Sequence, residues 1–205
     1  MIKELLDNNI YYYKNVIANP NEFVKEIERL DSLSQENAHL TKWMRWTSSN
    51  NPNDIFGEYK SGAFTAPQSN NDVDKRYALI VATILNAINL CVADYSESLN
   101  KDLGFLPNEV TIRKYFPPAQ MGPHIDCEED DDEARLTASI VLYLNDDYVG
   151  GDLAFPEQDI KIKPEAGSLV IFPSVKPYFH ASTPLVSGNK YMCPAFMFKR
   201  SKIIS

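Results

Sequence analysis

Short strand-like runs separated by turn residues occupy the chain from residue 109 to residue 198. β-Branched and aromatic residues are frequent in the runs, and turn-forming residues gather between them, as in Pro164-Glu165-Ala166-Gly167. Strands of this length and spacing are typical of an all-β barrel or a double-sheet jelly roll. The predicted strands are residues 109–115, 136–144, 152–155, 159–162, 168–172, 178–182 and 191–198.

Two helical patterns precede these strands. Asn19-Pro20-Asn21-Glu22 supplies an N-cap, a proline in the first turn and an acidic residue three positions after the cap, which predicts a helix over about residues 20–33. A second, longer apolar stripe recurs at helical spacing. It comprises Tyr77, Ile80, Ile84, Ile88, Cys91, Tyr95 and Leu99. We expect both helices to pack on the outside of one sheet.

The 205 residues are enough for one domain, and no linker separates two cores. The predicted domain is α+β and mainly β. It has a helical and loop part over about residues 1–105 and a jelly-roll core, a double-stranded β-helix, over about residues 106–200. Residues 43–71 are predicted to be loop with short strands. Trp43, Trp46, Tyr59 and Phe64 in that segment are interpreted as anchors to the core, with an active-site lid as the alternative.

The net charge of −8 argues against nucleic acid as a partner, because phosphate binding requires clustered cations. Cys91, Cys127 and Cys193 are scattered and odd in number, which is typical of reduced thiols. The N-terminus has no signal-like apolar segment, and the apolar stretch 78–93 is interrupted by polar residues and short for a membrane span. The sequence therefore predicts a cytoplasmic protein without a membrane partner, and it leaves the oligomeric state open.

His124 and Asp126 stand one residue apart, and His180 lies in a later predicted strand. Side chains at i and i+2 of an extended segment project from one face, so the first two can point into the same cavity. A lone His-x-Asp pair is more often a loop hydrogen bond than a metal site. Together with His180 it supplies two imidazoles and one carboxylate, the protein ligands of non-haem Fe(II) oxygenase sites.

Lys190 follows the predicted turn Ser187-Gly188-Asn189, which would return the chain beside the same cavity as His180. An unpaired ammonium in a dry cavity is costly, so Lys190 requires an anion. The distal carboxylate of a dicarboxylic cosubstrate would satisfy it. A surface lysine after a turn is the ordinary alternative, and the nearby His180 favours the cavity.

Four motifs, in this order, resemble the prolyl 4-hydroxylase branch of the Fe(II)/2-oxoglutarate-dependent dioxygenases. They are Pro-His-Ile-Asp at 123–126, Leu-Tyr-Leu-Asn at 142–145, Gly-Gly-Asp-Leu-Ala-Phe-Pro at 150–156 and His-Ala-Ser-Thr-Pro-Leu-Val-Ser-Gly-Asn-Lys at 180–190. The resemblance covers about residues 109–199. It is specific for the superfamily, less so for the branch, and silent on the substrate.

The resemblance implies that His124, Asp126 and His180 bind iron and that Lys190 binds 2-oxoglutarate, with Tyr143 and Tyr115 beside it. Both tyrosines have packing in a strand as the alternative. It implies Fe(II), the cosubstrate 2-oxoglutarate and O2, with ascorbate as reductant. The implied reaction is hydroxylation, with release of succinate and CO2.

Two features depart from the family pattern. The approach to His124 contains Pro117-Pro118 and lacks an aromatic residue usual in the family, and Pro194 interrupts the last predicted strand. A proline removes a ladder donor, so a bulge or a strand edge is expected at Pro194.

The substrate is left open: a prolyl residue in a peptide or protein comes first, by analogy, and a free amino acid or small metabolite second. A nucleic-acid demethylase, a non-oxidative metal enzyme holding zinc or manganese, and a binding module without catalysis are weaker alternatives. The acidic run 128–133 is interpreted as a solvated loop, with a gate for a cationic substrate as the alternative.

Overall fold

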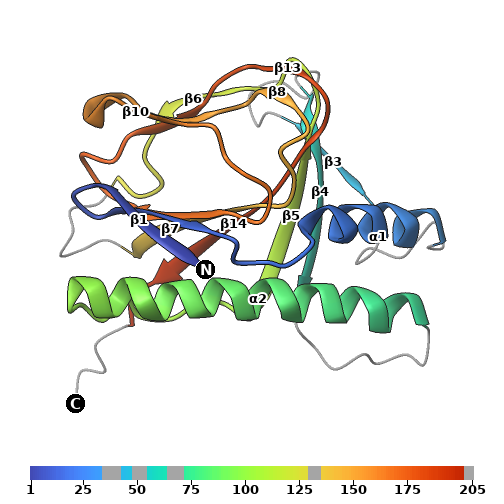
Figure 1. Cartoon of the computed structure of the whole chain (residues 1–205), viewed down its shortest axis with the longest axis horizontal. Helices are drawn as coiled ribbons and strands as arrows, with labels where there is room; N and C mark the ends of the chain where they lie inside the picture. The colour runs from blue at the N-terminus through green and yellow to red at the C-terminus, as the bar shows by residue number, and fades with distance from the viewer. Residues whose placement is uncertain (34–42, 48–54, 64–71, 129–134, 201–205) are drawn as a thin grey trace.

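The structure is a computed structural model that describes residues 1–33, 43–47, 55–63, 72–128 and 135–200. It contains two α-helices and antiparallel sheets, a mixed α+β fold. In Figure 1 the long helix α2 (Asp72–Leu99) runs across the view below the strands, and α1 (Pro20–Leu33) lies above one end of it. The acidic residues 129–133 and Phe64 lie outside the described residues.

The larger sheet has eight strands in the order β1-β2-β11-β7-β14-β5-β4-β3. Its central strands β11, β7 and β14 pair antiparallel, and so do β5 and β14. The strands are β1 (Ile2–Asp7), β2 (Ile10–Lys14), β3 (Met44–Thr47), β4 (Ile55–Ala63), β5 (Glu109–Tyr115), β7 (Leu136–Tyr143), β11 (Leu169–Pro173) and β14 (Lys190–Phe198).

The smaller sheet has four strands in the order β10-β9-β12-β6. They are β6 (Met121–His124), β9 (Leu153–Phe155), β10 (Ile160–Ile162) and β12 (His180–Ser182), with the 3-10 turn η1 (Pro156–Gln158) between β9 and β10. A third, two-stranded sheet joins β8 (Val149–Gly150) to β13 (Leu185–Ser187). At the turn after β13, Gly188 has a φ of +79°, and a Cβ there would lie 2.9 Å from the Asp147 carbonyl oxygen.

Alternating side chains of the larger sheet build two separate cores. On β7, Ile140 and Leu142 pack in the core that includes the helices, whereas Val141 and Tyr143 pack in a core shared with the smaller sheet. This is the period-two alternation of a strand buried on both faces. The larger sheet therefore forms the middle layer, with the helices on one face and the smaller sheet on the other.

The helices form for the reasons visible in their sequences. Helix α1 spans the predicted residues and buries Ile27 and Leu30, while α2 buries the predicted stripe, including Ile84 and Ile88. By length and composition α2 would also pass for a membrane span. Its buried stripe packs on the sheet instead, as expected for a core helix.

The N-terminal part contains strands that the sequence analysis did not predict. β1 and β2 form a hairpin around Asn8-Asn9, and β2 continues the larger sheet by pairing with β11. On β2, Tyr13 packs in the helix-side core and Tyr12 in the core between the sheets. Before residue 105 the sequence analysis expected short strands within residues 43–71 alone and missed this hairpin, whose consecutive tyrosines suit a strand buried on both faces.

Three smaller expectations concern Pro194, Trp43 and the cysteines. Pro194 lies where β14 pairs with β7, beyond the residues Lys190–Met192 that pair with β5, so it occupies an edge and not the bulge at Met197/Phe198. Trp43 packs against the helix-side core with its ring 6.1 Å from that of Tyr191, which makes it an anchor. The three cysteines are free and buried, as expected.

Replacing Ile84 by alanine should lower the free energy of unfolding by about 2–5 kcal/mol, because the side chain is fully buried between α2 and the sheet. Leu79→Ala on the same helix is the control. Its side chain is 68% exposed, so a change within about 0.5 kcal/mol is expected. Urea denaturation of both variants measures the difference, and equal losses would contradict the assignment of the buried face.

Candidate metal centre and cosubstrate pocket

His124 and His180 face each other across two paired strands. His124 ends β6, His180 begins β12, and the two are register partners in the smaller sheet. Their ring centroids lie 4.3 Å apart. Because directly opposed residues of an antiparallel pair project from the same face, the pairing alone brings the two imidazoles together.

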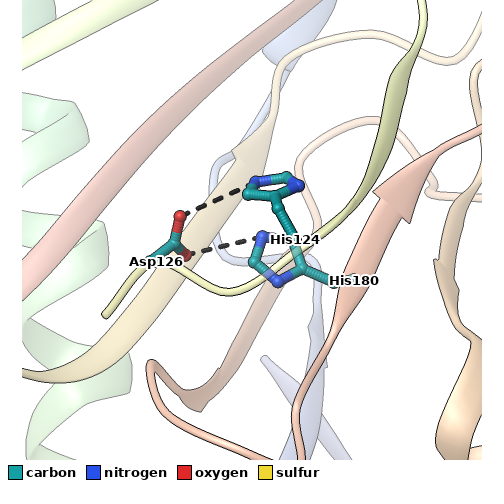
Figure 2. A group of neighbouring side chains, drawn as sticks. All are labelled: His124, Asp126 and His180. Carbon is teal, nitrogen blue, oxygen red and sulfur yellow. Dashed lines mark ion pairs between the residues drawn. The ribbon is translucent and has the colours of Figure 1, made fainter. Parts of the chain in front are cut away.

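Asp126 completes the group from a bend two residues beyond β6 (Figure 2). Its Oδ1 lies 3.8 Å from His124 Nε2, and its Oδ2 lies 3.5 Å from His180 Nε2. One ligand atom from each of the three residues falls within 4.8 Å of the others. The predicted residues therefore converge, although the strand ends at His124 and the bend, rather than extended geometry, turns Asp126 inward.

Backbone carbonyls orient both imidazole rings. The Nδ1 atoms of His124 and His180 lie 2.9 Å from the Gly122 oxygen and 3.3 Å from the Tyr178 oxygen. A carbonyl only accepts, so each Nδ1 carries the proton and each Nε2 keeps its lone pair. The Nε2 atoms are the nitrogens that face Asp126. Burial also lowers the pKa of His180, with Asp126 acting in the opposite direction, which favours the neutral ligand form.

A serine that sequence reasoning missed holds Asp126, and a second missed serine contacts the first. The Ser139 hydroxyl donates to Asp126 Oδ2 at 2.6 Å and lies 2.8 Å from the Ser174 hydroxyl. Both serines are about 1% exposed. A serine at a cavity-facing position of the apolar strand β7 was the available signal, because a buried hydroxyl requires a partner.

Lys190 lies in the same cavity and is 3% exposed. Its Nζ donates to the Gly151 carbonyl and, at 3.3 Å, to the Ser182 hydroxyl. Three tyrosine rings surround the ammonium, with their centroids 5.2 to 5.9 Å away: Tyr143, Tyr115 and Tyr148. Burial lowers the pKa of Lys190 to about 8, and Asp152 opposes that shift.

The two predicted tyrosines, Tyr115 and Tyr143, line this cavity. The sequence analysis missed Tyr148, the third ring beside Lys190. Tyr115 is the register partner of Lys190 on β5, and Tyr143 ends β7; burial raises the pKa of both hydroxyls. Tyr148 precedes β8, and its buried hydroxyl has no hydrogen-bond partner among the described residues. No sequence motif distinguished Tyr148 from a packing tyrosine.

The cavity lies between the two sheets and joins both groups of residues. Its apolar lining comes from both sheets and includes Val141, Leu153 and Met192. Among the described residues that line it, the charged side chains other than the histidines are Arg113, Asp126 and Lys190. The same cavity therefore presents imidazole and carboxylate donors and an ammonium, in a largely apolar surrounding.

The donor set fits a ferrous ion. Two neutral imidazoles and one carboxylate, each held by a hydrogen bond from its other side, are the ligand types of non-haem Fe(II) sites. The buried ammonium with hydroxyl neighbours fits one carboxylate of a dianion. The match to Fe(II) and the match to a carboxylate both follow from the side-chain groups that converge in the cavity.

Solved structures with a similar fold include prolyl hydroxylases at low sequence identity. A viral collagen prolyl hydroxylase from Paramecium Bursaria Chlorella virus-1, in complex with 2-oxoglutarate, has a TM-score of 0.62 and 16% identity, covering 95% of this chain and 97% of its own. A Pseudomonas putida prolyl-4-hydroxylase has a TM-score of 0.60 and 19% identity, covering 96% of each chain.

A Trichoplax adhaerens prolyl hydroxylase in complex with a hypoxia-inducible-factor peptide has a TM-score of 0.65 and 14% identity, covering 94% of this chain and 84% of its own. At these identities the likeness concerns the fold alone. No curated protein matches the sequence.

Residues 110–198 match the model of the 2OG-Fe(II) oxygenase superfamily. The matched segment contains His124, Asp126 and His180, whose ligand atoms converge, and it also contains Lys190. This segment is thus the part of the chain that matches the 2OG-Fe(II) oxygenase superfamily.

Proposed function

We propose that this protein hydroxylates its substrate by a reaction that consumes O2 and 2-oxoglutarate and releases succinate and CO2. The observation that carries the proposal is one cavity in which three ligand atoms converge within 4.8 Å and a buried ammonium faces the same space. His124, Asp126 and His180 would hold the iron. When bound, Fe(II) would activate O2, the oxidant, so that one oxygen atom enters succinate as 2-oxoglutarate loses CO2 and the other enters a C–H bond of the substrate.

Lys190 is proposed to bind the distal carboxylate of 2-oxoglutarate. Its present partners, a carbonyl and a hydroxyl, are neutral, so a carboxylate would supply the counter-charge that a buried ammonium requires. Lysine is a compact charge without the planar fork of arginine. The hydroxyls of Ser182, Tyr143 and Tyr115 are proposed to complete the binding of the carboxylate oxygens.

The remaining residues would position the reactants and limit access of water. Ser139 holds Asp126, and the rings of Phe172 and Phe155 pack against His180 with centroids 4.6 and 6.1 Å away. Such packing limits ring rotation and keeps the surroundings apolar, which strengthens electrostatic contacts inside the site. We also propose that the two facing sheets form the double-stranded β-helix expected from the sequence.

A prolyl residue in a peptide or protein is the first proposed substrate. The support is the fold likeness to prolyl hydroxylases, one of them in complex with a peptide. The net charge of −8 argues against a nucleic-acid substrate, because phosphate groups are bound by clustered cations. We further propose a cytoplasmic location, so the substrate would be an intracellular one.

A carboxylate-bearing small molecule, such as a free amino acid, is the second proposed substrate. Arg113 favours it, because this guanidinium lines the cavity in addition to the ammonium of Lys190. Arginine binds a carboxylate through paired hydrogen bonds. A free amino acid would bring its carboxylate close to the carbon that is hydroxylated.

The protein should release succinate from 2-oxoglutarate under air when loaded with Fe(II), and not when loaded with Zn(II). His180→Ala should abolish this turnover, because the second imidazole is lost from the centre. Succinate is measured by chromatography, and a thermal melt shows whether the variant is folded. Full activity of folded His180→Ala protein would remove His180 as an iron ligand.

Lys190→Met should raise the dissociation constant of 2-oxoglutarate by roughly 10- to 100-fold, the loss expected for a charge-assisted hydrogen bond. Titration calorimetry on protein loaded with Mn(II) measures it. Lys161→Met, which alters a lysine with a side chain 62% exposed, is the control and should leave the affinity unchanged.

The affinity for 2-oxoglutarate should also fall with rising pH. The ammonium of Lys190 is protonated below its pKa of about 8, so the dianion binds fully there and loses its partner as pH rises above that value. Lys190→Met should lack this step. An unchanged affinity between pH 7 and 9 in the wild type would contradict the assignment.

The two substrate classes can be separated by mass spectrometry. Proline-containing peptides and free amino acids are incubated with the Fe(II) protein, 2-oxoglutarate and air, and a gain of one oxygen atom is measured. Arg113→Met should raise KM for a free amino acid and leave KM for an internal peptidyl proline unchanged. Oxygen gained by a free amino acid alone would favour the second class.

A further inference from the structure

Lys190 and Tyr115 belong to two strands that are also held together on the opposite face of the sheet. Lys190 pairs with Tyr115, and the next rung of the same ladder pairs Tyr191 with Lys114. Successive side chains of a strand point to opposite faces. Lys190 and Tyr115 therefore face the cavity, while Tyr191 and Lys114 face the helices.

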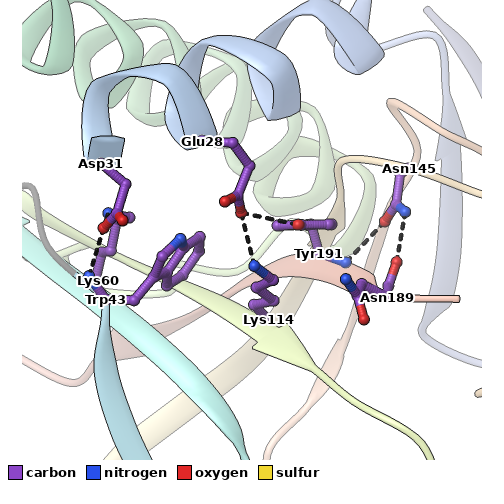
Figure 3. A network of polar contacts seen from close by, with 8 residues as sticks. All are labelled: Glu28, Asp31, Trp43, Lys60, Lys114, Asn145, Asn189 and Tyr191. Carbon is purple, nitrogen blue, oxygen red and sulfur yellow. Dashed lines mark hydrogen bonds and ion pairs between the residues drawn. The ribbon is translucent and has the colours of Figure 1, made fainter. Parts of the chain in front are cut away.

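One carboxylate on α1 connects the helix-facing rung. Glu28 Oε1 accepts hydrogen bonds from the Lys114 ammonium at 3.0 Å and from the Tyr191 hydroxyl at 2.8 Å (Figure 3). The Lys114 side chain is 12% exposed and the Glu28 side chain 37%, so the ion pair is shielded from solvent on the lysine side and reached by solvent on the carboxylate side. A single oxygen atom of α1 thereby spans β5 and β14 directly behind the two cavity residues.

The backbone around Lys190 is held as well. The Asn145 side chain accepts from the Tyr191 N–H at 2.7 Å and donates to the Asn189 carbonyl, also at 2.7 Å. Asn145 is 3% exposed. The peptide groups on both sides of Lys190 are thus fixed, which leaves the Tyr191 ring and its hydroxyl as the contact through which α1 acts.

We propose that Glu28 is a positioning residue for 2-oxoglutarate, which acts by holding the Lys114–Tyr191 rung so that Lys190 and Tyr115 meet the distal carboxylate. The inference rests on the proposed function of Lys190. A lysine has a long, flexible side chain and binds as a point charge, so its reach depends on where its backbone is held.

The same helix offers a matched pair that does not touch β14. Asp31 on α1 accepts from the buried Lys60 of β4 at 2.7 Å (Figure 3). Lys60 pairs with Ile112 on β5, away from the rung that carries Tyr191. Both carboxylates dock α1 on the sheet. Glu28 contacts Tyr191 of β14 directly, whereas Asp31 accepts from the Trp43 N–H at 2.8 Å and is linked to Tyr191 through the Trp43 ring, whose centroid lies 6.1 Å from that of Tyr191.

Glu28→Gln and Asp31→Asn are therefore compared in the full-length protein loaded with Mn(II), with titration calorimetry of 2-oxoglutarate and thermal melts. Both variants should lower Tm. Glu28→Gln should raise the dissociation constant roughly three- to tenfold, as expected for a weakened charge-assisted hydrogen bond, and Asp31→Asn should leave it unchanged. With Fe(II), KM for 2-oxoglutarate should rise while the maximal succinate rate stays near that of the wild type.

A second comparison tests the route through Lys190. In the Lys190→Met background, Glu28→Gln should have no further effect on 2-oxoglutarate affinity, because the group it positions is gone. If Glu28→Gln does not fold, Tyr191→Phe removes one of the two contacts and should shift the dissociation constant in the same direction.

Three results would overturn the inference: an unchanged affinity in Glu28→Gln, an equal loss in Asp31→Asn, or additive effects in the double variant. A wild-type protein that does not bind 2-oxoglutarate would overturn the proposed function and the inference with it. These outcomes are distinguishable, because the last appears before any substitution is made.

Discussion

Alternation of side chains along β14, β7 and β5 is the constraint on which the rest of the structure depends. On β14, Tyr191 and Cys193 pack toward the helices, while Lys190 and Met192 face the cavity. A shift of one residue in the pairing would exchange these two sets and bury the wrong one on each side. The helix-side core therefore does more than stabilise the domain: it sets the register that places Lys190 in the pocket.

Burial has opposite consequences for the two groups in the cavity. It favours neutral His180, which suits a metal ligand, and it disfavours charged Lys190, which suits an anion partner. The Nδ1 contacts and Ser139 orient the ligand atoms before anything binds. The same cavity thus holds a group of metal-ligand side chains and a cation, the two features on which the proposed binding of iron and 2-oxoglutarate depends.

At 14–19% identity with the structures described above, the fold is shared while few residues are. A buried sheet tolerates exchange of apolar side chains of similar volume, so its pattern survives when its residues change. A site of three converging ligands tolerates no such exchange, because each donor atom has a defined chemical role. Residues that contact the substrate are bound neither by the apolar pattern of the sheet nor by the chemistry of the converging ligands. A shared fold therefore does not distinguish a peptidyl proline from a free amino acid, and experiment must do so.

The sequence by itself determined both helices, most core strands, the grouping of His124, Asp126 and His180, and the place of Lys190 in the same cavity. These follow from local periodicity and from motifs whose residue types carry their own chemistry. Only the tertiary structure decided the β1–β2 hairpin, the serine that holds Asp126, Tyr148 beside Lys190 and the contact of Glu28 with Tyr191. The reason is physical: each depends on pairing or hydrogen bonding between residues remote in the chain, and no local pattern specifies which distant partner a tyrosine, serine or glutamate will meet.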